Sequence, residues 1–325
     1  MSRLVPLFAV AALGALLLAL RAPLATTVLG LIAFGVLHNV LELRYVAGRF
    51  AGVLRGRFLL LLVVLVSGIV ACRLAGARTP EIVLAYAVLA AGVVHAVRRP
   101  VWRAAALLGL AGAATASLTW PAYHFVILAH LHNVVPLVFL WEWARRLPTG
   151  RTPFRVAQLG WVLGVPALIL AGVFDPFVAG GPSAVAAFAG PPAAVAAPVV
   201  PPGLTIGLRF LVVFAYLQTM HYVVWVGFLP RYAPEAARAF DARVRWLAGW
   251  RPWALGIGFA VLLAILFVAD YRQGRLLYAS FASYHAYLEF PVLLALLFGA
   301  RHGSRHQEAT AGITSRPMIS SGVMS

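Results

Sequence analysis

The segment FLLLLVVLVSGIVACRLAG, from Phe58 to Gly76, carries a single charged side chain, that of Arg73. About 20 mainly apolar residues are enough for an α-helix to cross the hydrocarbon of a bilayer. Nine similar runs flank this segment, and the full set is 4–20, 23–43, 58–76, 81–97, 103–118, 122–142, 155–175, 204–229, 252–270 and 276–299. The sequence therefore predicts an all-α, polytopic integral membrane bundle of about ten transmembrane helices.

The composition supports this prediction and excludes several kinds of chemistry. Of the 325 residues, 62% are hydrophobic and 11% are charged, whereas soluble domains are roughly 25% charged. A soluble domain and a disordered chain are both excluded. All basic residues are arginines, so chemistry that needs a lysine is excluded, and the single cysteine, Cys72, excludes disulfides and thiolate metal clusters. In a membrane protein the net charge of +17 does not indicate nucleic acid, and we expect no such partner.

The arginines predict how the chain is oriented. If successive runs cross the membrane in alternate directions, 20 of the 26 arginines fall on one side. Cytoplasmic loops carry an excess of basic residues, so both termini are predicted to be cytoplasmic. We expect one transmembrane domain over 1–300 and a disordered cytoplasmic tail over 301–325. Arginine-only basicity with much Ala, Val, Gly and Leu indicates a GC-rich bacterial genome, and hence a bacterial inner-membrane protein.

The longest predicted outer loop, roughly 176–203, has no charged residue and is rich in Gly, Pro, Ala and Val. Two interpretations are open: a segment that caps the outer face of the bundle, or a floppy apolar linker. We favour the linker.

Histidines are confined to alternate spans. An ionisable group at the bilayer centre costs at least ~2.5 kcal/mol on insertion scales, so it indicates function. Outside the tail, all histidines lie on even-numbered spans, at positions His38, His95, His124, His130, His132, His221 and His285. Counted from the cytoplasmic ends, four of them lie at overlapping depth: His38, His132, His221 and His285. Four histidines from four helices at one level are what a metal site in a bundle requires.

Two carboxylates accompany this set. Glu42 and Glu289 each follow a histidine by four residues, on the same helix face as His38 and His285. Imidazole and carboxylate donors without a thiol favour iron, manganese or zinc. We assign both glutamates to the catalytic centre, either as metal ligands or as groups that orient the imidazoles. Glu142, near a cytoplasmic helix end, is expected to pair with an arginine such as Arg145.

The second span with a candidate ligand, 122–142, holds two histidines, His130 and His132, which project about 200° apart on a helix. We favour His132 because the sequence LHNV at 131–134 repeats LHNV at 37–40, and we keep His130 as the alternative. Asn39 and Asn133 are predicted to form hydrogen bonds in the same layer. Aromatic residues that flank the histidines are predicted to line a substrate pocket: Tyr222, Trp225, Tyr284 and Tyr287.

The motifs HNVLE (38–42), LHN (131–133), TMHYVVW (219–225) and YHAYLE (284–289) together resemble the Brp/Blh family. That family comprises the membrane-integral β-carotene 15,15′-oxygenases found with microbial rhodopsins. Three positions depart from its pattern: Asn39 and Glu42 stand where the family has glycine and aspartate, and Trp225 stands where it has a second histidine. The resemblance implies a non-haem iron centre that uses dioxygen on a lipid-soluble substrate.

The sequence thus predicts a membrane-embedded, metal-dependent oxidoreductase or oxygenase, most simply with non-haem iron. Its partners would be membrane lipids and a hydrophobic substrate such as a carotenoid or another lipid, and a partner reductase is left open. Two alternatives remain. One is an electron carrier with haem b held by two histidines, and the other is a proton- or cation-coupled transporter with a His/Glu relay.

Overall fold

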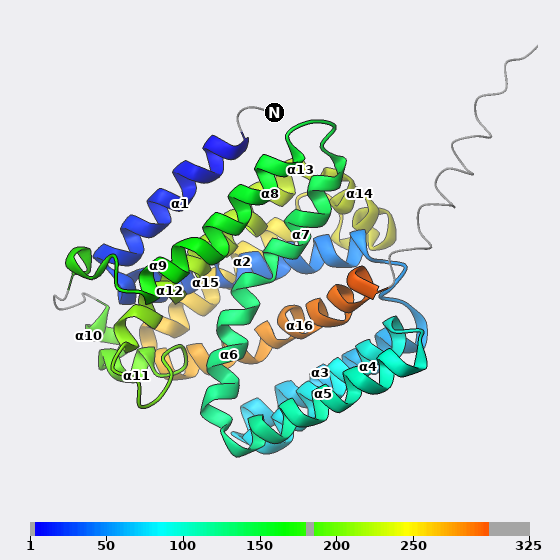
Figure 1. Ribbon diagram of the computed structural model, residues 1–325, viewed down its shortest axis with the longest axis horizontal. Helices are drawn as coiled ribbons and strands as arrows, with labels where there is room; N and C mark the ends of the chain where they lie inside the picture. Colours follow the sequence, from blue (N-terminus) through cyan, green and yellow to red (C-terminus); the bar gives the residue numbers. More distant parts are fainter. Residues whose placement is uncertain (1–3, 180–184, 299–325) are drawn as a thin grey trace, which may run out of the picture.

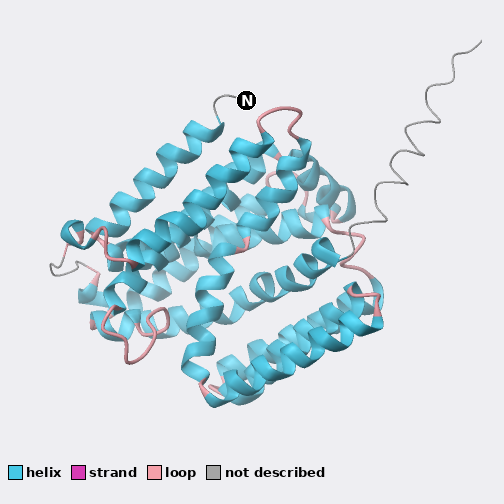
Figure 2. Cartoon of the chain, in the orientation of Figure 1, coloured by secondary structure: helices cyan, strands magenta, loops and turns pink. Residues whose placement is uncertain are grey.

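A computed structural model describes residues 4–179 and 185–298, and these residues form helices and connecting turns without a strand (Figure 2). Ten spans within them are long and apolar enough to cross a membrane, and each overlaps one predicted run. The prediction of an all-α polytopic bundle is confirmed. The predicted tail, 301–325, lies outside the described residues.

Seven spans are continuous helices: α1 (Leu4–Arg21), α2 (Pro23–Arg49), α3 (Gly56–Leu74), α4 (Arg78–Ala96), α5 (Pro100–Thr119), α15 (Arg251–Ala269) and α16 (Tyr271–Phe298). Three spans are composite: α6 (Pro121–Val134) with α7 (Pro136–Trp143) and η1 (Ala144–Arg146), α8 (Arg151–Leu159) with η2 (Gly160–Gly164) and α9 (Val165–Leu170), and α12 (Gly207–Tyr222) with η4 (Val223–Phe228) and α13 (Leu229–Tyr232). Short elements connect them: η3 (Asp175–Phe177), α10 (Ala186–Ala189), α11 (Pro192–Ala196), α14 (Pro234–Arg243) and η5 (Arg245–Leu247).

Proline punctuates these helices in two ways. Several helices begin with proline in the first turn, as at Pro23, Pro100 and Pro121, where a missing N–H costs nothing because that group has no helical partner. Pro136 instead interrupts a span, because it cannot donate a hydrogen bond to the carbonyl of His132 four residues earlier. Helix α6 consequently ends at Val134.

The bundle places α16 between two groups of helices. Helices α3, α4 and α5 lie along one side, and α1, α8, α9 and α12 lie along the other (Figure 1). Helix α16 packs against α2, α3, α4 and α15. The α12 span is the most buried of the ten. The interior is therefore formed mainly by α2, α12 and α16, which are far apart in the sequence.

Ion pairs at the two ends of the bundle agree with alternating spans. Three pairs join groups on the predicted cytoplasmic side: Arg44–Asp241, Arg49–Glu142 and Arg146–Glu235. Two pairs join groups on the predicted outer side: Arg73–Glu81 and Arg209–Asp175. Within the described chain, no ion pair between arginine and a carboxylate connects the two sides. Glu142 pairs with Arg49, at 2.6 Å, and not with the neighbouring Arg145. The cytoplasmic location of the termini stays a prediction.

The close packing of α14 on α2 depends on one glycine. A Cβ atom at Gly48 would lie 2.0 Å from the carbonyl oxygen of Ala236. Any larger residue would therefore push α14 away from α2. The same contact carries the ion pair between Arg44 and Asp241, with an N–O distance of 2.7 Å.

The segment 185–203 forms a cap and not a floppy linker, so our preference was wrong for these residues. It contains α10 and α11 at the end of the bundle opposite α14 (Figure 1). Three hydrogen bonds attach its backbone carbonyls to transmembrane helices: from His130 to Val199 (2.8 Å), from Tyr123 to Pro202 (2.8 Å) and from Arg275 to Val195 (3.2 Å). Residues 180–184 of the predicted loop lie outside the described residues.

Candidate metal centre

Four transmembrane helices bring five potential metal ligands together. Helix α2 contributes His38 and Glu42, and α16 contributes His285. His132 lies near the end of α6, and His221 lies near the end of α12, directly before the π-helical turn η4. One donor atom from each of the five lies within 4.8 Å of all the others. Turns of this π type occur often at functional sites.

The four imidazoles form a closed ring. The ring centroids of His38 and His221 are 5.0 Å apart, and those of His221 and His132 are 4.6 Å apart. His132 and His285 are separated by 4.7 Å, and His285 and His38 by 5.0 Å. Each imidazole therefore contacts two others, at interplanar angles of 52° to 90°.

The cluster is buried on all sides but one. His38, His221 and His285 are at most 2% exposed, and Glu42 and Glu289 are 0% exposed. Only the His132 side chain is appreciably accessible, at 16%. Access to the cluster is therefore from the side of His132.

Two histidines have their ring orientation fixed by hydrogen bonds from Nδ1. His38 Nδ1 lies 3.0 Å from the carbonyl oxygen of Phe34, which can only accept a hydrogen bond. His132 Nδ1 lies 2.9 Å from Oε2 of Glu289. A histidine that donates from Nδ1 keeps the lone pair of Nε2 for a metal ion. Nε2 is therefore the atom of both residues that is free to bind a metal ion.

The spacing of the donors suits a single small ion. Two ligands about 2.1 Å from one ion and at right angles are ~3.0 Å apart, and opposite ligands are ~4.2 Å apart. The Nε2 atoms of His132 and His285 are 3.1 Å apart. The largest separation, 4.8 Å, exceeds the ideal by a few tenths of an ångström per donor.

Several donors of the cluster have no hydrogen-bond partner in the described part of the chain. These are both carboxylate oxygens of Glu42, both ring nitrogens of His221, Nδ1 of His285 and Oε1 of Glu289. Nε2 of His221 lies 3.6 Å from Oε2 of Glu42. A buried carboxylate without a partner is costly, and a cation would satisfy it. The residues present therefore fit a metal ion.

Each glutamate approaches a histidine of a different helix. Both were predicted from their spacing to share a face with the histidine one turn earlier. Glu289 of α16 instead binds His132 of α6, and Glu42 of α2 approaches His221 of α12. The carboxylates thus connect pairs of helices as well as adding charge to the centre.

A cavity of about 1270 Å³ extends from the cluster. Residues of α2, α6, α12, α16 and the 185–203 cap line it, and they include His38, His132 and His285. His221, Glu42 and Glu289 are not among its lining residues, so they lie behind the other three histidines. A molecule in the cavity would therefore contact the cluster at His38, His132 and His285.

The remaining predicted site residues are distributed as follows. Tyr222 and Tyr287 line the cavity, and the Tyr222 ring lies 4.8 Å from that of His38. Asn133 also lines the cavity, with its amide donating to the carbonyl of Ala129, and Asn39 is buried. His130 points away from the cluster, toward the cap.

Two predicted pocket residues do not line the cavity. Trp225 is 1% exposed and packs against Tyr45 and Phe139. Its position follows the π-helical turn that begins at Val223, which changes the angular spacing from His221. The Tyr284 hydroxyl lies 2.8 Å from Oγ of Ser67 on α3. Both side chains therefore join helices, and the expectation of a pocket role is corrected.

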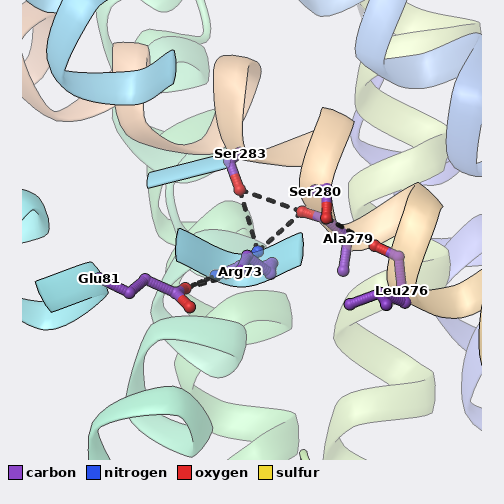
Figure 3. A network of polar contacts seen from close by, with 6 residues as sticks. All are labelled: Arg73, Glu81, Leu276, Ala279, Ser280 and Ser283. Carbon is purple, nitrogen blue, oxygen red and sulfur yellow. Dashed lines mark hydrogen bonds and ion pairs between the residues drawn. The ribbon is translucent and has the colours of Figure 1, made fainter. Parts of the chain in front are cut away.

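A buried polar network next to the cavity was not predicted from the sequence. Arg73 of α3 pairs with Glu81 of α4 and donates to the carbonyl of Ala279 (2.7 Å) and to Oγ of Ser283 (3.0 Å) on α16 (Figure 3). Ser283 lies two residues before His285. The available signal was a charged pair, Arg73 and Glu81, that flanks a short turn between two apolar runs.

Comparisons with family models, with curated proteins and with solved structures gave no match. The chain is a helical, membrane-type protein with a buried His/Glu cluster that can bind a metal ion.

Proposed function

We propose that this protein is a metal-dependent membrane oxidoreductase that oxidises a lipid-soluble substrate with dioxygen, and that its metal is non-haem iron. One observation carries the proposal: five buried nitrogen and oxygen donors converge within 4.8 Å at the end of a large, mainly apolar cavity. Imidazole and carboxylate donors suit iron, which supplies dioxygen activation when it is bound at a site with open positions.

The side chains around the centre have separate roles in this proposal. His38, His132, His221 and His285 hold the ion. Glu289 accepts the Nδ1 proton of His132 and so keeps the Nε2 lone pair of that ring directed at the centre. Glu42 supplies a negative charge that offsets part of the charge of the ion.

The cavity has the role of selecting and protecting the substrate. Phe125, Leu128 and Phe214 form apolar parts of its wall. Apolar walls bind a lipid-soluble molecule and exclude water from the reacting groups. Tyr222, next to His38, is the aromatic residue best placed to contact the reacting part of the substrate.

The packing of the imidazoles favours a bare ion over haem b. A haem would have to lie between its two axial histidines. The ring centroids of neighbouring histidines are only 4.6–5.0 Å apart, and each ring contacts two others. A macrocycle could enter only if the four helices separated. A transporter would need a path on both sides of the cluster, and the cavity described above reaches the cluster from the side of His132.

The test is dioxygen consumption by the iron-loaded protein in nanodiscs, supplied with a lipid extract from the producing cells. Mass spectrometry of the extract would identify an oxidised lipid. We expect consumption by the wild type and none by His221→Ala. His95→Ala is the matched control, because His95 is exposed and stacks on Phe58, outside the cluster. Equal consumption by wild type and His221→Ala would contradict the proposal.

A further inference from the structure

The cavity that reaches the histidines is basic at its other end. Four guanidinium groups line it, from Arg73, Arg78, Arg272 and Arg275, and they are opposed by one carboxylate, that of Glu81. These residues lie at the ends of α3 and α16 and at the start of α4, next to the 185–203 cap. Charge is therefore concentrated at the mouth, and the histidine cluster lies at the far end.

Most of this positive charge is not neutralised by the protein. Arg73 is held by Glu81, Ala279 and Ser283 (Figure 3). Arg78 and Arg272 are exposed, and no carboxylate of the described residues lies within 4 Å of either. Arg275 donates to the carbonyl of Val195, a neutral group. At least three cations are thus available to a ligand.

The distance from the mouth to the cluster suits a long molecule. Arg272 and His285 lie on one helix, thirteen residues apart, which corresponds to ~20 Å along the axis. Between them and beyond Arg275, the cavity is lined on α16 by Leu276, Tyr278, Ala279, Ala282 and Ser283, and the two alanines are small and apolar. Small apolar side chains on one helix face leave room for an extended chain beside the helix.

The wall formed by α6 is also apolar on the way to the histidines. On α6, Phe125, Leu128 and Ala129 line the cavity before His132 is reached. Their spacing places them on one face of the helix. The cavity volume of about 1270 Å³ exceeds the roughly 300–1,000 Å³ typical of small-molecule sites. A single extended apolar chain with a head group fits this shape.

We infer that the substrate is an amphiphile with an anionic oxygen head group, whose head binds Arg272, Arg275 and Arg78 and whose apolar chain reaches the histidines. The inference deepens the proposed function, since it rests on the same cavity. Guanidinium groups bind carboxylate and phosphate through paired, charge-assisted hydrogen bonds. Binding of the head group would fix how deeply the apolar chain of the ligand enters the cavity. One region of that apolar chain would then lie beside His38, His132 and His285.

The test measures binding to metal-free protein, so that it does not depend on activity. The full chain is depleted of metal with a chelator and placed in nanodiscs of phosphatidylcholine, which is zwitterionic. Radiolabelled palmitic acid, its methyl ester and lysophosphatidic acid are the three probes. The variant is Arg272→Gln/Arg275→Gln, and the control is Arg98→Gln/Arg99→Gln, two exposed arginines beyond the opposite end of α4.

We expect saturable binding of an anionic probe to the wild type and to the control. Loss of charge-assisted hydrogen bonds should weaken this binding about tenfold or more in Arg272→Gln/Arg275→Gln. Binding of the methyl ester should be weak and equal in all three proteins. Preference for palmitic acid would identify a carboxylate head, and preference for lysophosphatidic acid would identify a phosphate head.

Equal binding of the anionic probes by the variant and the wild type would overturn the inference, as would stronger binding of the methyl ester. Helical content and elution volume show whether the variant has folded. If the double variant has not folded, Arg272→Lys is tested in its place. Lysine retains the charge at this position, so this variant should lose only part of the affinity for the anionic probe. A protein that binds palmitic acid but no metal would contradict the proposed function alone, and one that binds iron but no anionic probe would contradict the inference alone.

Discussion

His132 of α6 donates a hydrogen bond from Nδ1 to Oε2 of Glu289 on α16, a residue 157 positions later in the chain. The histidine one turn before Glu289, His285, is not the partner of this carboxylate. Instead, Nε2 of His285 lies 3.1 Å from Nε2 of His132. Glu289 thus orients the imidazole of His132, which faces the imidazole of His285. The hydrogen bond between Glu289 and His132 also holds α6 against α16 at the level of the cluster.

The first prediction concerns this contact. Glu289→Leu removes the acceptor, whereas Glu289→Gln keeps an oxygen that can accept the proton of His132. Loss of a carboxylate that orients a metal-bound histidine typically lowers metal affinity ten- to hundredfold. We expect a loss of this size in Glu289→Leu and a smaller one in Glu289→Gln, measured by competition with a chelator. Unchanged affinity in Glu289→Leu would show that this contact does not support metal binding.

The second prediction concerns Glu42, one of the five converging donors. Both of its oxygens are buried and lack a hydrogen-bond partner in the described chain. In metal-free protein, Glu42→Gln should leave the free energy of unfolding nearly unchanged, because the amide has the same size and carries no charge that burial would penalise. In metal-loaded protein the same substitution should weaken binding. Thermal unfolding with and without metal checks both effects. If Glu42→Gln changed the midpoint of unfolding equally in the two states, the assignment of Glu42 to the metal centre would be contradicted.

The third prediction separates His132 from His130, which are two residues apart. His132→Ala should abolish stoichiometric metal binding, since its Nε2 faces the centre. His130→Ala should leave metal binding intact and should loosen the 185–203 cap, because it removes the hydrogen bond to the carbonyl of Val199. Limited proteolysis of the cap and metal analysis of both variants provide the measurements. Loss of metal in His130→Ala alone would reverse the assignment.

The fourth prediction tests the packing of α14. Gly48→Ala introduces a Cβ atom 2.0 Å from the carbonyl oxygen of Ala236. Such overpacking typically costs 1–3 kcal/mol, and we expect a lower midpoint of thermal unfolding. Gly52→Ala is the matched control, since a Cβ there meets nothing within 4 Å. Equal midpoints for the two variants would show that α14 is free to move away from α2.

The ten spans were predictable because hydropathy is a local property, readable along the chain. The level of the four histidines was also predictable, since helical rise converts position in the sequence into depth. Which side chains meet across helices was not predictable. The contacts of Glu289 with His132 and of Arg73 with Ser283 depend on how non-adjacent helices pack.

Irregular backbone accounts for the errors at Trp225 and in the 185–203 segment. The π-helical turn at Val223–Phe228 changes the position of Trp225, and no residue type in that stretch signals it. The uncharged 185–203 segment has a composition that suits either a linker or a cap. Its hydrogen bonds to Tyr123, His130 and Arg275 determine which one forms.

The central claim is that the His/Glu cluster holds non-haem iron. Elemental analysis and the absorption spectrum of the purified full-length protein, loaded anaerobically with ferrous iron, test it most directly. The account predicts stoichiometric iron without a Soret band in the wild type and loss of that iron in His285→Ala. A Soret band, or iron retained equally by His285→Ala, would contradict it.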